Sequence, residues 1–71
     1  MLFINWEMTM QNLRYALDHD GITHKGFAEH IGVSPQSLSR YLSCKDTPSA
    51  EILERMKSEI SFTVVMFHKG R

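Results

Sequence analysis

Hydrophobic side chains recur at helical spacing near the N-terminus of the chain. Trp6, Met10, Leu13 and Leu17 lie at positions i, i+4, i+7 and i+11. In an α-helix, which has a period of 3.6 residues, these positions form a stripe along one face. The pattern therefore predicts a first helix whose inward face carries these four side chains.

Two glycines predict where the first two helices end. Gly21 and Gly32 follow apolar stripes, and glycine adopts the left-handed backbone conformation found just past the end of many helices. Between them, Thr23 is the expected N-cap of a second, short helix. The inward face of this helix is expected to consist of its apolar residues, Phe27, Ala28 and Ile31.

Two pairs of a hydroxyl residue and a proline predict where the next helices begin. Ser34-Pro35 and Thr47-Pro48 each place a capping side chain directly before a proline, which suits the first position of a helix. The expected buried residues of the third helix are Leu38, Tyr41 and Leu42. Those of the fourth helix are Ile52, Leu53 and Met56.

After Glu59 the hydrophobic pattern changes from a helical period to alternation, and β-branched residues become frequent. This predicts a strand over residues 60–67. A lone strand leaves backbone groups unpaired, so the strand pairs either with Leu2-Phe3-Ile4 of the same chain or across a dimer. The candidate dimerisation residues are Phe62, Val64 and Met66.

The composition of the 71 residues, 42% apolar and 23% charged, is typical of one folded domain covering residues 1–71. The single cysteine, Cys44, excludes an internal disulfide and indicates a reducing, intracellular setting. No apolar run approaches the roughly 18 residues that span a bilayer. We expect a cytoplasmic protein and no membrane partner.

Residues that would support catalysis or cofactor binding are not evident in the sequence. We find no glycine-rich phosphate loop, paired carboxylates or Ser/His/Asp arrangement, and one cysteine with four scattered histidines makes a structural zinc site improbable. The sequence therefore predicts no enzyme, no metal, no cofactor and no small-molecule substrate.

Residues 24–43 have the spacing of a helix-turn-helix. The closest approach of the two helices needs a small residue, which is Ala28, and the turn needs a positive φ, which Gly32 provides. Five apolar residues form the wedge that sets the angle between these helices: Phe27, Ile31, Val33, Leu38 and Tyr41. The net charge of the chain is zero, but residues 23–45 carry three basic residues against one acidic residue, a net +2, which favours a nucleic-acid partner.

The chain resembles the Cro/C1-type (XRE-like) helix-turn-helix family from Leu13 to Met56. The resemblance rests on five short motifs: Leu13-Arg14, Thr23-His24, Phe27-Ala28, Gly32-Val33-Ser34 and Pro48-Ser49. It implies a mainly α, lambda-repressor-like domain of four to five helices, here followed by the C-terminal strand. Two segments depart from the family pattern. Leu42-Ser43-Cys44 stands where the family commonly has Glu-Asn-Gly, and His24-Lys25 follows the second cap where Glu or Gln is frequent.

The resemblance implies that the third helix enters the major groove of double-stranded DNA. It also implies that the protein is associated with the nucleoid of a bacterial or phage-host cell. The residues that it places at base edges are Pro35, Gln36, Ser37, Ser39 and Arg40. Gln36 can pair with adenine N6 and N7, and Arg40 with guanine O6 and N7. The implied phosphate contacts flank this helix and are Thr23, His24, Lys25, Ser43 and Lys45. The alternative interpretation of Gln36 and Arg40 is a solvated helix face.

Two functions remain open from the sequence. The first is a sequence-specific DNA-binding transcription regulator, a phage or prophage Cro-like repressor that binds an inverted-repeat operator as a homodimer. The second is a protein-interaction module on the same scaffold, such as an antitoxin or an adaptor. The zero net charge and the apolar residues 62–67 motivate the second function.

Overall fold

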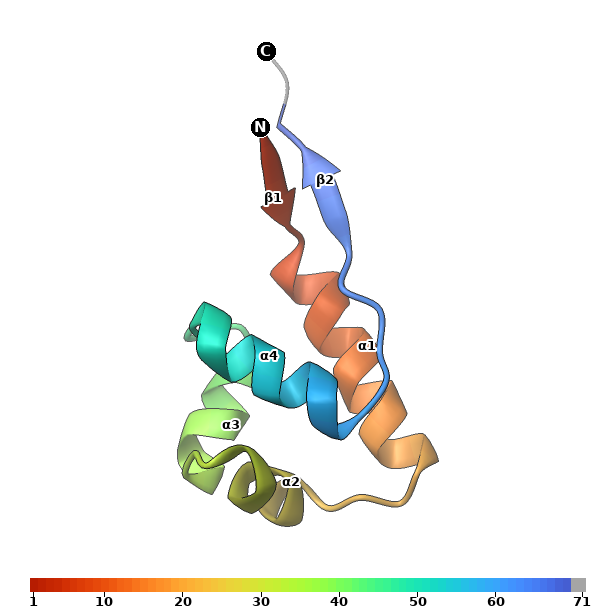
Figure 1. Ribbon diagram of the computed structural model, residues 1–71, viewed down its shortest axis with the longest axis vertical. Coiled ribbons are helices and arrows are strands. Elements are labelled where there is room, and N and C mark those ends of the chain that lie inside the picture. The colour runs from red at the N-terminus through yellow and green to blue at the C-terminus, as the bar shows by residue number, and fades with distance from the viewer. Residues whose placement is uncertain (70–71) are drawn as a thin grey trace.

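The computed structural model describes residues 1–69, which form a helical body and a pair of short strands (Figure 1). The elements in chain order are β1 (Leu2–Ile4), α1 (Trp6–His19), α2 (His24–Ile31), α3 (Pro35–Leu42), α4 (Ala50–Glu59) and β2 (Met66–His68). The mainly α fold predicted from the sequence is confirmed. No helix within residues 1–69 is long and apolar enough to cross a membrane.

Short polar side chains cap all four of these helices. Thr23 and Ser34 accept hydrogen bonds from the N–H groups of Gly26 and Ser37, each at 3.0 Å, as the sequence predicted. Asn5 caps α1 in the same way. The caps satisfy backbone donors that an isolated helix leaves unpaired.

The predicted cap of α4 was wrong. Ser49, not Thr47, caps this helix, and its Oγ accepts from the N–H of Ile52 at 3.2 Å. Pro48 is buried and precedes this cap, and the cap lies two residues later in the chain than predicted. Serine is preferred over threonine at the N-cap, a preference that favours Ser49 and that the sequence analysis did not use.

The core is formed by apolar residues from all four helices and from the residue that follows α4. These residues are Met10, Leu13, Leu17, Phe27, Ala28, Ile31, Leu38, Leu42, Leu53, Met56 and Ile60. Three residues expected to be fully inward, Trp6, Tyr41 and Ile52, are half-buried at the core edge. The helical spacing therefore predicted the correct faces but overestimated their width.

β1 and β2 pair as antiparallel strands, which confirms the intrachain alternative. Leu2 lies opposite His68, Phe3 opposite Phe67, and Ile4 opposite Met66. We call these two strands the terminal arm. It projects from the helical body at one end of the longest axis of the molecule, and α2 and α3 lie toward the other end (Figure 1).

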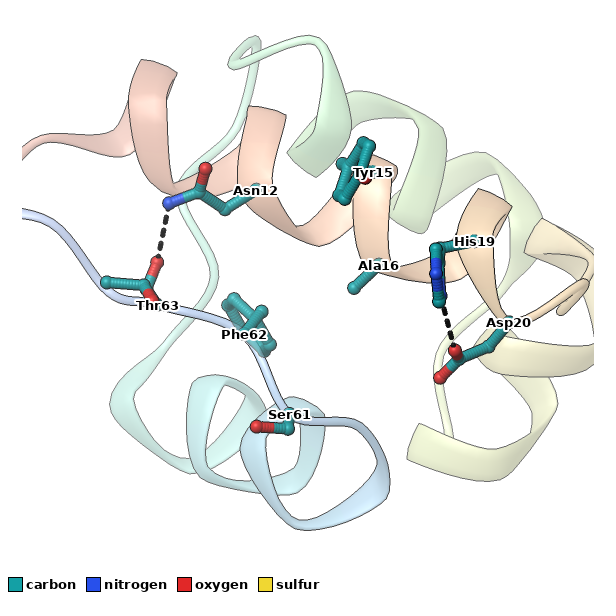
Figure 2. A pocket seen from close by; sticks show the side chains of 8 residues that line it. All are labelled: Asn12, Tyr15, Ala16, His19, Asp20, Ser61, Phe62 and Thr63. Carbon is teal, nitrogen blue, oxygen red and sulfur yellow. Dashed lines mark hydrogen bonds and ion pairs between the residues drawn. The ribbon is translucent and has the colours of Figure 1, made fainter.

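The predicted strand over residues 60–67 was too early and too long. Ile60 is the C-cap of α4, and residues 61–65 lie outside the sheet. Side chains of α1 hold this segment instead. Asn12 Nδ2 donates to the carbonyl of Thr63 at 3.0 Å (Figure 2), and Thr9 Oγ1 accepts from the N–H of Val65 at 2.9 Å. A helix face that offers polar groups can replace a neighbouring strand as the hydrogen-bond partner.

Candidate nucleic-acid interface

The turn between α2 and α3 sets the orientation of α3. Gly32 has a φ of 77°, a left-handed conformation that residues with a Cβ rarely adopt. The N–H of Val33 donates to the carbonyl of Ala28 at 3.0 Å, which closes the end of α2. Ala28 is fully buried, as expected for the point where two helices pack closely.

Arg55 of α4 supports the same turn, and the sequence analysis missed this contact. Its Nη1 donates to the carbonyl of Ile31 at 3.2 Å, and its Nη2 donates to Glu51 Oε2 at 3.1 Å. A Cβ built at Gly32 would lie 3.2 Å from Arg55 Nη1. The spacing of Glu51 and Arg55 indicates only a surface ion pair. The contact with Ile31 depends on how α4 crosses α2.

The candidate base-contact residues lie together on α3. Pro35, Gln36, Ser39 and Arg40 are exposed, and Ser37 is half-buried. The Ser37 hydroxyl accepts a hydrogen bond from the Ser34 hydroxyl at 3.0 Å, so it is already tied to the helix start. The exposed face therefore presents Gln36 and Arg40, one helical turn apart, as its long polar side chains.

Arg40 forms an ion pair with Asp46 in the loop after α3. Arg40 Nε lies 2.6 Å from Asp46 Oδ2, and Nη2 lies 3.4 Å from Oδ1. The hydrogen bond from Arg40 lowers the pKa of the Asp46 carboxyl below its ordinary value, and the bond to Asp46 raises the pKa of Arg40. The sequence analysis assigned no role to Asp46. The sequence signal for this pair was an acidic residue six positions after Arg40, beyond the end of α3.

The candidate phosphate contacts lie on two flanks of α3. Thr23, His24 and Lys25 are exposed at the start of α2, and Ser43 and Lys45 are exposed after α3. Two of these five side chains also form hydrogen bonds within the protein. Thr23 caps α2, and Ser43 Oγ donates to the carbonyl of Ser39 at 2.8 Å.

Arg14 of α1 is a cation near both flanks that the sequence analysis did not include among the phosphate contacts. It lines one shallow hollow with Ser43 and Cys44, and another with Asp18 and His24. Its side chain is exposed. The motif Leu13-Arg14 carried part of the family resemblance, so the sequence did contain a signal for this residue.

The three candidate dimerisation residues differ in exposure. Phe62 and Val64 are half-buried and pack against the core, and Figure 2 shows Phe62 in the space between residues 61–63 and α1. Met66 is exposed on β2. The exposed apolar side chains near the predicted strand belong instead to the terminal arm.

The sequence pattern of the helix-turn-helix family matches residues 13–63, which include α2, α3, α4 and the second half of α1. The chain belongs to the XRE-type helix-turn-helix family. No curated protein and no solved structure matches it. As a member of this family, the helix-turn-helix protein is a DNA-binding transcription regulator and binds double-stranded DNA.

Proposed function

We propose that this regulator is a Cro-like repressor of phage or prophage type that acts as a homodimer on an inverted-repeat operator. The observation that carries the proposal is the exposed face of α3, where Gln36 and Arg40 extend from a helix that is capped by Ser34 and preceded by a tight turn. In helix-turn-helix complexes the corresponding helix lies in the major groove.

Base recognition is assigned to five residues of α3. Gln36 pairs with adenine and Arg40 with guanine, and each bidentate pair gives about 1–3 kcal/mol of discrimination between bases. The remaining three are short side chains that permit close approach of the helix to the bases: Pro35, Ser37 and Ser39.

Phosphate contacts orient α3 in the groove. They are assigned to the exposed residues on either flank, Thr23, His24, Lys25, Ser43 and Lys45. Arg14 joins this set because it lies beside both flanks. The N–H groups that begin α2 add partial positive charge at the start of this helix. Such contacts position the protein and carry little sequence information.

The terminal arm supports dimerisation better than residues 62–64 do. Leu2, Phe3, Met66 and Phe67 are 52%, 37%, 45% and 44% exposed, although large apolar side chains are usually buried. Each strand of the arm also has a free edge, because the sheet in residues 1–69 has two strands. A two-fold dimer of helix-turn-helix domains places its recognition helices about 34 Å apart, one turn of DNA.

Selection of bound duplexes from a random pool, together with the mass in solution, tests the proposal. We expect a symmetric motif whose half-sites are one helical turn apart, and a mass of two chains. Arg40→Ala should weaken binding to that motif about tenfold and leave the fold intact, as measured by circular dichroism. Glu54→Ala on α4 is the matched exposed control. A regulator that enriches no motif from the pool contradicts the proposal.

The exposed arm also favours a second function, docking of the regulator to a different protein as an antitoxin or adaptor does. Free strand edges can pair with a strand of a partner. The salt dependence of DNA binding separates the two functions. A DNA-binding repressor loses affinity linearly on a log–log plot of affinity against salt, whereas an adaptor alone shows little DNA binding at any salt concentration.

A further inference from the structure

Asp46 is attached to the end of α3 by its backbone as well as by its side chain. Its N–H donates to the carbonyl of Arg40 at 3.3 Å, and the N–H of the preceding Lys45 donates to the same carbonyl at 2.9 Å. The carboxylate then returns to the guanidinium of Arg40. The position of Asp46 is therefore fixed relative to the residue whose side chain it contacts.

Stability of the fold does not account for this arrangement. The side chains of Arg40 and Asp46 are 54% and 48% exposed, and exposed ion pairs contribute little to the free energy of folding. The ion pair instead fixes the conformation of the Arg40 side chain, because a paired arginine loses the rotamer freedom that an exposed arginine otherwise keeps.

Because Asp46 occupies one edge of the guanidinium, it determines which N–H donors of Arg40 remain for DNA. Asp46 contacts Nε and Nη2. Because a guanidinium has five N–H donors in a planar fork, Nη1 and the second hydrogen of Nη2 remain, and these form the edge at the tip of the side chain. That edge offers two parallel donors, which match the two acceptors O6 and N7 of guanine.

We propose that Asp46 is a positioning residue for base recognition: it holds Arg40 with the tip of its guanidinium directed into the groove, and so sets the preference for guanine. The inference rests on the proposed function. The negative charge of Asp46 also opposes the approach of phosphates, so Arg40 is kept from the sequence-independent backbone contact that a free arginine would make. Asp46 thus lowers affinity for DNA in general and raises selectivity for one base.

Asp46→Ala tests the inference, with Arg40→Ala used first to find which position of the selected motif depends on Arg40. Asp46→Ala should reduce the preference for guanine at that position about fivefold to tenfold, while binding to unrelated duplex strengthens because a negative charge near the phosphates is lost. Base preference at the other positions should not change. Glu54→Ala removes an exposed carboxylate on α4 and should leave all base preferences as they are.

A double variant separates positioning from a general structural role. In an Arg40→Ala background, Asp46→Ala should have no effect on base preference, because the side chain that it positions is gone. Equal loss of preference at every position, or the same loss in both backgrounds, would show a structural role and overturn the inference. Should Asp46→Ala lower the melting temperature, the isosteric Asp46→Asn takes its place, and a smaller loss of guanine preference is expected.

Failure of the inference is distinguishable from failure of the proposed function. If the wild-type regulator selects a motif and Asp46→Ala keeps the full preference for guanine, Asp46 does not position Arg40 and the DNA-binding function stands. If the wild-type regulator selects no motif, the proposed function fails and the inference fails with it.

Discussion

The hydroxyl of Thr9 accepts a hydrogen bond from the backbone N–H of Val65 at 2.9 Å, and Thr9 is fully buried. The carbonyl of Val65 in turn accepts from the N–H of Asn5 at 2.7 Å. Both backbone polar groups of Val65 are therefore paired with the start of α1. This pairing determines where the chain leaves the helical body to form β2.

Thr9→Val should lower the free energy of unfolding by about 1–3 kcal/mol, because it leaves the N–H of Val65 without an acceptor at nearly constant side-chain volume. Urea unfolding followed by circular dichroism measures the change. Thr9→Ser keeps the hydroxyl and is the control. If Thr9→Val loses little free energy and Thr9→Ser loses more, packing of the threonine methyl group and not the hydrogen bond is what Thr9 supplies.

Gly32→Ala should destabilise the protein more than Gly21→Ala. Both glycines have a positive φ, 77° and 69°, but a Cβ at Gly32 would lie 3.2 Å from Arg55 Nη1 and a Cβ at Gly21 would contact nothing within 4 Å. The shared backbone strain is about 1–2 kcal/mol. The additional loss of unfolding free energy in Gly32→Ala measures the displacement of Arg55 from the carbonyl of Ile31. This additional loss should disappear in an Arg55→Ala background. Equal losses for the two alanine variants in thermal or urea unfolding would contradict this.

Cys44→Gly should stabilise the protein by about 0.5–1 kcal/mol, since relief of left-handed strain outweighs the greater freedom of glycine in the unfolded chain. Cys44 has a φ of 62° and is exposed. It stands where related sequences commonly have the glycine of Glu-Asn-Gly. Cys44→Ser changes the thiol without changing the backbone preference and should be neutral. A gain in both variants would point to the thiol and not to the backbone.

The Asp46 carboxyl should titrate below the ordinary aspartate pKa of about 3.9, since its pKa is lowered by the hydrogen bond from Arg40. The stabilisation from this pair is present above that ordinary value and is lost as the pH falls through the lowered pKa of the folded state. An NMR titration of the carboxyl carbon gives the midpoint. Arg40→Ala should return it to the ordinary value, and Arg55→Ala should leave it where it is. An unshifted midpoint in the wild-type protein would mean that the pair does not persist in solution.

The parts of the fold that were predicted correctly have local signals in the sequence. Thr23 and Ser34 cap helices because their hydroxyls reach a backbone N–H three residues away, and Gly32 ends α2 through its own backbone. The spacing of apolar residues along each helix correctly predicted that Leu13 and Leu38 lie in the core. These features depend on residues within one or two helical turns.

The parts that were missed depend on contacts between distant segments. Alternation over residues 60–67 has the same period whether the partner is a strand or, as for Thr63 and Val65, the polar face of α1. Arg55 of α4 donates to the carbonyl of Ile31, the last residue of α2. For the candidate interface, the exposed face of α3 was predicted, but Asp46 beside Arg40 was not, because helical periodicity does not extend into the loop that carries it.

The terminal arm has a consequence for the order in which the protein folds. Its pairing joins Leu2 to His68, and the N–H of Lys69 donates to the carbonyl of Met1, whereas each helix closes over a few residues. Closing a long loop has a large entropic cost and slows the formation of distant contacts. We therefore expect the arm to assemble after the helices have docked. In the dimer that we propose, a chain still emerging from the ribosome would offer no such surface to a second chain, and association through the arm would wait until the helical body is complete.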